Sequence, residues 1–480
     1  MTDRIVGVRG GPTSTAVVMA DVDALGVAVE ELAARCGADG RRLAAAASGA
    51  SFVGDQLVPE LATTAAAMGE AMRAVTGGAA RSEAELSELA WDLRRAAAAY
   101  RQAEDEQVRS WRLLDLAAGC AVGVAGLPAV AGVAAALGVT GVNPLADKPD
   151  LVDHLVRGLP GAALCAATRL LPQVGPGLAG AAAGSPDGPV PLSAGLLAGL
   201  FTPGTYRVRE LGPGPTVVPP ASLADLARPL LPADQPPPGW LQVDAIEVTL
   251  PDGATHTTYQ VVLPGTDDWS PPWVQRSSDA ARDLGSNLEL MAGRRTELTR
   301  SLPSVLDLAG VPPGADVVLI GHSQGGLVAY QAAGDAQLRA RVHITDVVTF
   351  AAPLALMAPP KGVRVLSLEN QRDVVPHADG QPNRERREHV TLTFDTGPVP
   401  AGGDWVGYPH GMEQYLRGAD LFDSAAARGD PALAAVLQGL RSRLVLARRD
   451  QARTSRVRSS RRYQVSIDRG AQPPVLGTPR

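Results

Sequence analysis

The sequence predicts an α/β fold with a mostly parallel sheet, preceded by an all-α helical hairpin. From residue 241 onward, short apolar strands alternate with helical stretches, which is typical of a parallel sheet layered with helices. Between residues 14 and 106 there is one proline, and apolar residues recur at spacings of three and four, as in long amphipathic helices. With 480 residues, 45% of them hydrophobic, the chain is long enough for two or three folded units.

Residues 1–111 form the predicted helical hairpin. Two apolar stripes mark its helices, one of Val22, Leu25, Val29, Leu32 and Cys36, the other of Leu86, Leu89, Leu93, Ala97 and Tyr100. Residues 51–55 between the stripes read as the turn. We therefore expect two antiparallel helices, each with one apolar face.

Residues 112–202 are rich in Ala and Gly and are predicted to form apolar helices. Residues 116–142 carry no charge and are long enough to cross a bilayer, but their six glycines and one proline favour a buried or surface-associated helical pair. Both interpretations stay open. The three cysteines of the chain are too few and too scattered for a disulfide framework or a metal cluster.

Residues 203–240 hold ten prolines, a density that blocks regular structure and predicts a linker or a surface wrap. The sheet domain is expected over residues 241–440. A β-hairpin is indicated at 243–250 and 258–263, and further strands at 316–320, 345–350, 364–368 and 389–394.

The charge of the chain is unevenly distributed. The net charge is −6, yet residues 441–480 contain 11 arginines against Asp450 and Asp468. A basic tail of this kind can contact nucleic acid or anionic lipid, but we expect a solvated, poorly ordered end and no nucleic-acid partner. The first residues show no basic segment followed by an apolar stretch, so no ordinary signal peptide is visible.

One motif carries chemistry. The strand 316–320 runs directly into Gly-His-Ser-Gln-Gly at 321–325, and an apolar helix follows. A strand, a turn of small residues and an immediate helix are what a nucleophile elbow needs, with Ser323 exposed on a strained tip. The alternative is a glycine-rich turn or a phosphate loop, but the segment lacks the Lys of a P-loop and the glycine spacing of a dinucleotide site.

A serine hydroxyl needs a base to take its proton and an acid to orient that base. Asp373 lies in the loop after strand 364–368, where the acid belongs, and Glu369 is the reserve candidate. For the base we favour His410, in a loop leading into a helix, because His377 follows the acid too closely and His389 opens the next strand. Asp373 as a plain turn carboxylate and His410 as a surface residue are the alternatives.

The reaction also requires donors for the oxyanion of the tetrahedral intermediate. One should be the backbone N–H of Gln324, directly after the nucleophile. The second should come from the loop after an early strand, for which Leu-Pro-Gly-Thr at 263–266 offers Thr266. An ordinary strand-ending turn is the alternative for this loop.

Together these segments resemble the lipases of the α/β-hydrolase superfamily, especially the class III type. The resemblance covers residues 241–420 and includes the motifs at 321–325, 264–266, 349–353 and 373–376, followed by His410. It implies an α/β-hydrolase core with Ser323 as nucleophile, Asp373 as acid, His410 as base and Thr266 with Gln324 at the oxyanion. It implies no metal or cofactor. The family usually has an Arg before the Gly of the oxyanion loop, where this chain has Pro264.

The N-terminal hairpin resembles the Trp-x-Gly helical hairpins secreted by actinobacterial type VII systems. The matching residues are Phe-Val-Gly at 52–54, with Phe in place of Trp, and Tyr100 followed by Glu104. This resemblance implies a secreted or envelope location reached without a signal peptide, and a partner hairpin or a self-dimer through residues 16–106. The alternatives are a plain dimerisation hairpin and a cytoplasmic location.

The sequence thus predicts a serine ester hydrolase acting through an acyl-enzyme. The substrate is expected to be lipid-like, because Trp269, Trp273 and Trp405 fall near the predicted site and can cover an acyl chain, although they can also plug loops against the core. Membrane association through residues 116–142 would keep such a substrate close. The alternative function is a non-catalytic, secretion-linked or envelope interaction protein that keeps the same scaffold.

Overall fold

The computed structural model describes residues 3–11, 14–54, 59–125, 190–215, 218–231, 234, 236–250, 252–270, 279–400, 403–404, 406–447 and 455–469. These residues form two compact units. We call Pro12–Ser110 the hairpin unit, and Met1–Gly11 with Trp111–Arg480 the sheet unit. Each unit is described by itself.

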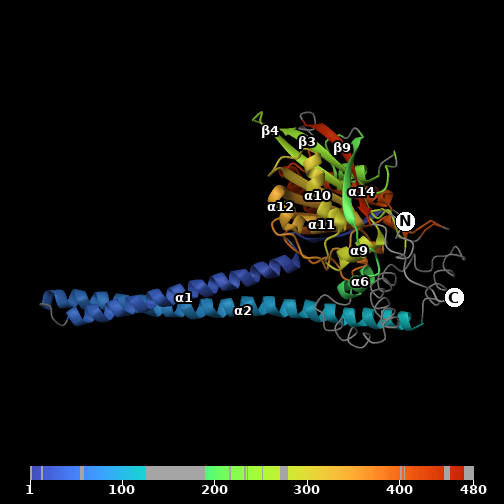
Figure 1. Ribbon diagram of the computed structural model, residues 1–480. Coiled ribbons are helices and arrows are strands. Elements are labelled where there is room, and N and C mark those ends of the chain that lie inside the picture. The colour runs from blue at the N-terminus through green and yellow to red at the C-terminus, as the bar shows by residue number, and fades with distance from the viewer. Residues whose placement is uncertain are drawn as a thin grey trace. The chain divides into compact units, whose positions relative to one another are not determined.

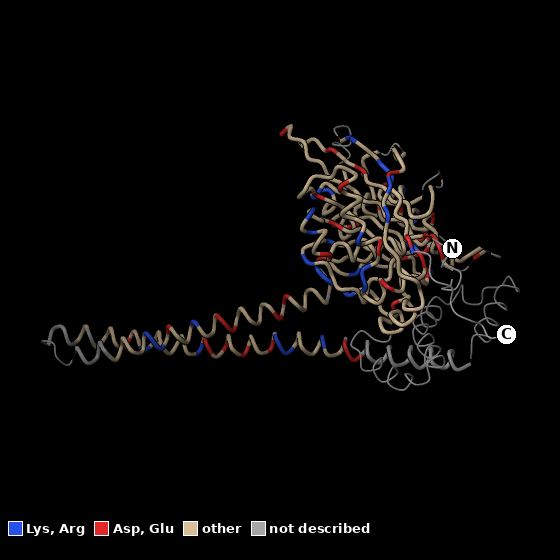
Figure 2. Tube along the Cα trace, viewed as in Figure 1, with Lys and Arg blue, Asp and Glu red and all other residues tan. Residues whose placement is uncertain are grey.

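The hairpin unit consists of α1 (Thr15–Gly54) and the part of α2 (Pro59–Ala125) up to Ser110, which lie antiparallel (Figure 1). Three ion pairs join the helices in one constant antiparallel register: Asp23–Arg101, Glu30–Arg94 and Arg41–Glu83. Charged residues of both signs occur along the helices (Figure 2). The expected hairpin is therefore present, with α1 continuing through Gly54, so the turn begins later than predicted.

Small side chains form the contact between the two helices. Ala33, Ala90 and Ala97 are at most 2% exposed, and a Cβ at Gly37 would lie 2.1 Å from the Glu83 carboxylate. Large apolar side chains of the predicted stripes lie outside this contact: Leu25, Leu32 and Leu89 are about half exposed. The helices approach closely because alanine and glycine leave room for it.

The sheet unit contains one sheet of nine strands, in the order β1-β8-β7-β6-β5-β4-β3-β9-β2. Figure 1 shows its neighbouring strands β4, β3 and β9. The strands are β1 (Arg4–Gly10), β2 (Thr205–Pro213), β3 (Trp240–Thr249), β4 (Thr255–Leu263), β5 (Asp316–His322), β6 (His343–Phe350), β7 (Arg364–Asn370), β8 (His389–Asp395) and β9 (Ser455–Asp468). The four pairings from β4 to β8 are parallel and the other four are antiparallel. The α/β class is confirmed, but the sheet is mixed rather than mostly parallel, because antiparallel strands extend it at both ends.

Helices cover both faces of this sheet. The helices described from residue 190 onward are α6 (Val190–Ala198), α7 (Leu223–Ala227), η1 (Arg228–Leu230), α9 (Leu284–Met291), α10 (Glu297–Leu308), α11 (Gln324–Gly334), α12 (Ala336–Arg341), η2 (Val375–His377), α13 (Gly407–His410), α14 (Met412–Ala427) and α15 (Pro431–Ser442). Along β5, Val317 and Leu319 join the core with α9 to α12, whereas Val318 and Ile320 join the core with α7, α14 and α15. A strand buried on both faces needs a continuous apolar run, which explains its sequence.

Three predicted domain assignments are wrong. β1 lies within the range assigned to the hairpin, yet it pairs with β8 in the sheet. The assigned linker 203–240 holds β2 and α7, because its prolines fall mainly outside these short elements. The assigned tail 441–480 holds β9, which lies between β3 and β2.

The basic residues of β9 do not form a solvated tail, because alternate residues of the strand are buried and carboxylates of the sheet unit pair with its arginines. Tyr463 and Val465 are fully buried, while Arg456 pairs with Glu247 and Arg461 with Glu210. These arginines therefore have carboxylate partners inside the sheet unit.

The predicted apolar region 112–202 lies mostly outside the described residues. α2 covers its start through Ala125, and α6 follows from Val190. Of the segment 116–142, residues 126–142 lie outside the described part. None of the helices described combines the length and apolarity needed to cross a bilayer.

Candidate active site

Ser323 lies on a strained turn between β5 and α11, but it is only 3% exposed, not exposed as expected, because His410 and the 264–266 loop lie against it. Its backbone has φ 53° and ψ −121°, a conformation that costs of order 1–3 kcal/mol for a residue other than glycine. Its N–H donates to the Phe350 carbonyl at 2.8 Å, which holds the turn against β6. A Cβ at Gly325 would lie 1.9 Å from the Leu263 carbonyl oxygen, so only glycine allows β4 to approach this closely. This is the geometry expected of a nucleophile elbow.

The structure brings the three predicted triad residues together. His410 Nε2 lies 2.9 Å from Ser323 Oγ, and His410 Nδ1 lies 2.7 Å from Asp373 Oδ2. A carboxylate accepts, so the Nδ1–H of His410 donates to Asp373 and leaves Nε2 free to accept from the serine hydroxyl. His410 ends α13 and is 15% exposed at its side chain, whereas Asp373 follows β7 and is fully buried. The arrangement forms a continuous chain of hydrogen bonds.

The alternative acid and bases have other partners. Glu369 accepts from Asn383 Nδ2 at 2.6 Å. His389 lies 2.8 Å from Ser367 Oγ, and burial together with nearby arginines lowers the pKa of His389 to about 4. His377 lies in η2, after the acid. The geometry thus favours Asp373 and His410 over these candidates.

Asp373 is held from both sides. The Tyr415 hydroxyl donates to its Oδ2 at 2.7 Å and accepts from the backbone N–H of Asn370 at 3.2 Å. The N–H of Val375 donates to its Oδ1 at 2.9 Å. Burial and the neighbouring Asp373 raise the pKa of Tyr415 well above its ordinary value, so this hydroxyl stays protonated and can donate. The carboxylate is therefore locked toward His410.

His322, inside the elbow, turns toward the backbone of the candidate base. Its Nε2 donates to the carbonyl of His410 at 3.0 Å. Desolvation and the adjacent His410 lower the pKa of His322 to about 3, so its ring is neutral near pH 7. His322 thus connects the turn at Ser323 to α13, which ends at His410.

The predicted oxyanion residues lie beside Ser323. A Cβ at Gly265 would be 3.3 Å from the Ser323 Cβ, which places the 264–266 loop against the nucleophile. Thr266 Oγ1 accepts from Asn287 Nδ2 at 2.9 Å. Gln324 is the first residue of α11, where backbone N–H groups have no partner within the helix. Both residues are therefore placed near the candidate nucleophile.

Three residues of this neighbourhood were missed by sequence reasoning: Arg282, Asn287 and Tyr415. Arg282 is 1% exposed and donates to the Gly265 carbonyl in the 264–266 loop, and Asn287 donates to Thr266. In the sequence, Asp283 is the local feature that could have indicated a helix start beside Arg282. Its side chain caps α9 by accepting from the Ser286 N–H at 2.7 Å. Among the described residues, no cluster of three or more His, Cys, Asp or Glu is arranged to hold a metal ion.

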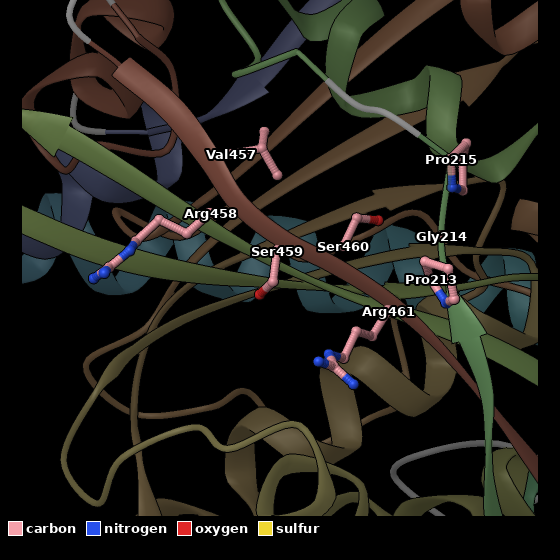
Figure 3. Close-up of a pocket in the computed structure, with 8 residues that line it drawn as sticks. All are labelled: Pro213, Gly214, Pro215, Val457, Arg458, Ser459, Ser460 and Arg461. Carbon is pink, nitrogen blue, oxygen red and sulfur yellow. The ribbon is translucent and has the colours of Figure 1, made fainter.

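A surface groove of about 570 Å³ lies elsewhere in the sheet unit, between β9 and the end of β2 (Figure 3). Its lining residues are Pro213, Gly214, Pro215, Val457, Arg458, Ser459, Ser460 and Arg461. Arg461 pairs with Glu210, and Arg458 shares Glu247 with Arg456, so each cation of the groove already has a carboxylate partner. The groove includes none of the predicted site residues.

Of the tryptophans predicted near the site, Trp269 is 57% exposed and lies three residues after Thr266. Trp273 and Trp405 lie outside the described residues. Comparisons with protein-family models, curated proteins and solved structures gave no match to this chain.

Proposed function

We propose that this protein is a serine-dependent carboxylic ester hydrolase with an α/β-hydrolase core of the class III lipase type. The observation that carries the proposal is the hydrogen-bond chain from Ser323 through His410 to Asp373, built on a serine with positive φ. A strained backbone at a buried turn is retained where the surrounding structure enforces it, and such strain clusters at active sites. A structural turn gains nothing from it.

In the proposed mechanism, His410 Nε2 takes the hydroxyl proton while Ser323 Oγ attacks the ester carbonyl carbon. The N–H groups of Gln324 and Thr266 stabilise the oxyanion, and His410 returns the proton to the departing alcohol. Water then attacks the acyl-enzyme with His410 again as base, which releases the acid and regenerates Ser323. Asp373, held by Tyr415, stabilises the imidazolium formed in each step.

Fluorophosphonate labelling and ester turnover test this proposal. Wild-type protein should take the label at Ser323, and Ser323→Ala should lose the label and at least about 10³-fold in kcat, because the three groups act as one unit. Ser367→Ala is the matched control, since Ser367 also contacts a histidine ring but should not be labelled. An unlabelled wild-type protein with unchanged turnover in Ser323→Ala would leave the non-catalytic interaction protein as the function.

We further propose a lipid-like substrate. The exposed indole of Trp269 beside the oxyanion loop supports this, because such a ring can cover an acyl chain or rest at a lipid interface. In a chain-length series of acyl esters, long chains presented on vesicles should be preferred and Trp269→Ala should weaken that preference. A strong preference for acetyl esters that ignores vesicles would point to a small-ester esterase.

For the hairpin unit, we propose a partner hairpin, from a second copy or a small protein, that forms a four-helix bundle. The exposed Leu25, Leu32, Leu89 and Trp91 support this, because they leave apolar surface uncovered. A monomer in sedimentation velocity, alone and with co-expressed proteins, would argue against it.

We also propose type VII export to the envelope or medium. It is tested by Tyr100→Ala with Glu104→Ala, which should block export and leave ester turnover unchanged. Membrane association through residues 116–142 is tested by vesicle flotation.

A further inference from the structure

We propose that Arg282 is a positioning residue that aims and polarises the backbone N–H of Thr266 toward the oxyanion. The inference rests on the proposed ester hydrolysis and concerns a residue outside the predicted site. Arg282 lies just before α9 and is 1% exposed. No element of the catalytic triad touches its side chain among the contacts the structure describes.

The guanidinium binds the oxyanion loop directly. Its Nε donates to the Gly265 carbonyl at 2.8 Å, and another nitrogen donates to the carboxylate of Asp267 at 2.7 Å. A third contact reaches the Trp240 carbonyl at the start of β3. The backbone carbonyl of Arg282 in turn accepts from the N–H of Asp267 at 2.8 Å. One residue therefore holds the loop by both its side chain and its backbone.

The contact at Gly265 determines where Thr266 can donate. The carbonyl of Gly265 and the N–H of Thr266 belong to one peptide unit, which is planar and trans, so the two groups point in opposite directions. Fixing the carbonyl on Arg282 therefore fixes the N–H on the other side of the unit. A cation at the carbonyl also polarises the peptide, which makes its N–H a stronger donor.

The same short segment reaches the second predicted donor. The carbonyl of Asp283 accepts from the Gln324 side-chain Nε2 at 3.1 Å, and Asn287 donates to Thr266 Oγ1 at 2.9 Å. Residues 282–287 thus brace both Thr266 and Gln324. A buried guanidinium is unfavourable unless it is paired and hydrogen-bonded, and here its partners belong largely to the oxyanion loop. We therefore assign the Arg282 guanidinium the role of holding the oxyanion loop in place.

The test compares an ester with the matching thionoester, in which sulfur replaces the carbonyl oxygen. Sulfur is a weaker hydrogen-bond acceptor, so a working oxyanion site favours the ester. In Arg282→Met, ester kcat should fall about 10²-fold with little change in KM, the loss typical of one oxyanion donor. The thionoester should be affected less, so the ester-to-thionoester ratio should fall about 10-fold or more, by the same reasoning. A lower folded fraction would reduce both rates equally and leave the ratio unchanged.

Two further variants keep the result interpretable. Arg282→Lys retains a cation but not the planar guanidinium, so its ester-to-thionoester ratio should lie between those of wild type and Arg282→Met. If Arg282→Met does not fold, Arg282→Lys takes its place in the test. Arg364→Met is the matched control, because Arg364 also joins a carboxylate, Asp346, to a backbone carbonyl, but at the opposite end of β7 from Asp373. Its ratio should equal that of wild type.

The outcomes separate the two proposals. Wild-type turnover that depends on Ser323, together with an unchanged ratio in the folded Arg282 variants, would overturn the role of Arg282 and leave the proposed function standing. If wild type hydrolyses no ester, the proposed function fails and the inference fails with it. A fall in the ratio confined to the Arg282 variants supports both.

Discussion

The two units of this chain bury different kinds of side chain. Among the side chains described in the hairpin unit, the buried apolar residues are Val17 and the alanines at 33, 47, 90 and 97. The sheet unit buries Leu, Val, Ile, Phe and Tyr in two cores, one on each face of the sheet. Burying a large apolar side chain contributes about 1.5–3 kcal/mol, several times the contribution of an alanine methyl. The sheet unit therefore has its own large core, whereas the hairpin unit depends on close helix contact.

The two units also differ in their strained backbone and their buried charged side chains. The positive φ of Ser323 and the buried charges of Asp373 and Arg282 lie in the sheet unit, where surrounding elements hold them in place. In the hairpin unit, the ion pairs Glu30–Arg94 and Arg41–Glu83 are largely exposed and contribute about 0–1 kcal/mol each. A chemical site needs rigid surroundings, and among the residues that the structure describes, a large apolar core that can provide them lies in the sheet unit.

The largest expected effect tests the sheet core. Phe394 is fully buried and makes edge contacts with Tyr415 and Phe422, at ring-centroid distances of 5.3 and 6.1 Å. Phe394→Ala should reduce the free energy of unfolding by about 3–5 kcal/mol, because it leaves a cavity. Peptide-level hydrogen exchange on the full chain should show this loss in the sheet unit and not in α1 or α2.

Leu32→Ala in the hairpin unit is the control for that prediction. Leu32 is 49% exposed, so its removal should change the stability of the monomer by no more than about 0.5 kcal/mol. Equal loss of protection in both units after Phe394→Ala would mean that they unfold together, and the contrast drawn between them would not hold.

The second prediction concerns acid. The hairpin unit contains no histidine, whereas the sheet unit holds His322 and His389 with pKa values lowered to about 3 and about 4. Because a lowered folded pKa means that the unfolded chain binds the proton first, stability is lost as the pH falls below about 6.5. At pH 5 the loss should be about 2 kcal/mol for each histidine. Hydrogen exchange at pH 7 and pH 5, corrected for intrinsic rates, should show it in the sheet unit alone.

A variant isolates one of these histidines. His389→Gln removes one titrating ring, so its loss of stability between pH 7 and pH 5 should be smaller than that of wild type by about 2 kcal/mol. Buried carboxyls with raised pKa values, such as Asp244 and Asp346, titrate alike in both proteins and cancel in the difference. An identical slope in wild type and variant would exclude His389 as a source of the acid sensitivity.

The parts predicted well from the sequence are those with local signals. The strands expected at 316–320, 345–350, 364–368 and 389–394 correspond to β5, β6, β7 and β8, because strands covered by helices on both faces are rich in Val, Ile, Leu and Phe. The candidate site followed from them, since Ser323, Asp373 and His410 each come after one of these strands. The glycines at 321 and 325 supplied the remaining signal, because close approach of strand and helix requires them.

The elements and residues that the sequence did not predict depend on contacts between residues far apart in the chain. β1 pairs with β8, and β2 with β9, across more than 200 residues, and no local feature of either segment indicates its partner. The arginines of β9 read as a tail because the carboxylates that match them, Glu210 and Glu247, lie far back in the sequence. Arg282 was missed because two of its acceptors are backbone carbonyls, which any residue possesses.

The smallest expected effect tests the small-residue contact of the hairpin unit. Ala97 is 1% exposed between α1 and α2, so Ala97→Leu should force the helices apart. Overpacking of this kind costs about 1–3 kcal/mol, and the loss of protection should be confined to α1 and α2.

Leu89, on the same helix and 48% exposed, is the matched position, and Leu89→Ala should cost no more than about 0.5 kcal/mol in the monomer. These effects are the reverse of those usual in a protein core. Adding a large apolar side chain at Ala97 destabilises the hairpin unit, whereas removing one at Leu89 does not. If Ala97→Leu instead stabilises the hairpin, its helices lie far enough apart to accept a leucine, and close packing is not what holds the unit together. If Leu89→Ala costs as much as Ala97→Leu, a partner covers the exposed face under the conditions measured. Repeating the measurement over a range of protein concentrations separates this last case, because a self-association contribution grows with concentration and a contribution within one chain does not.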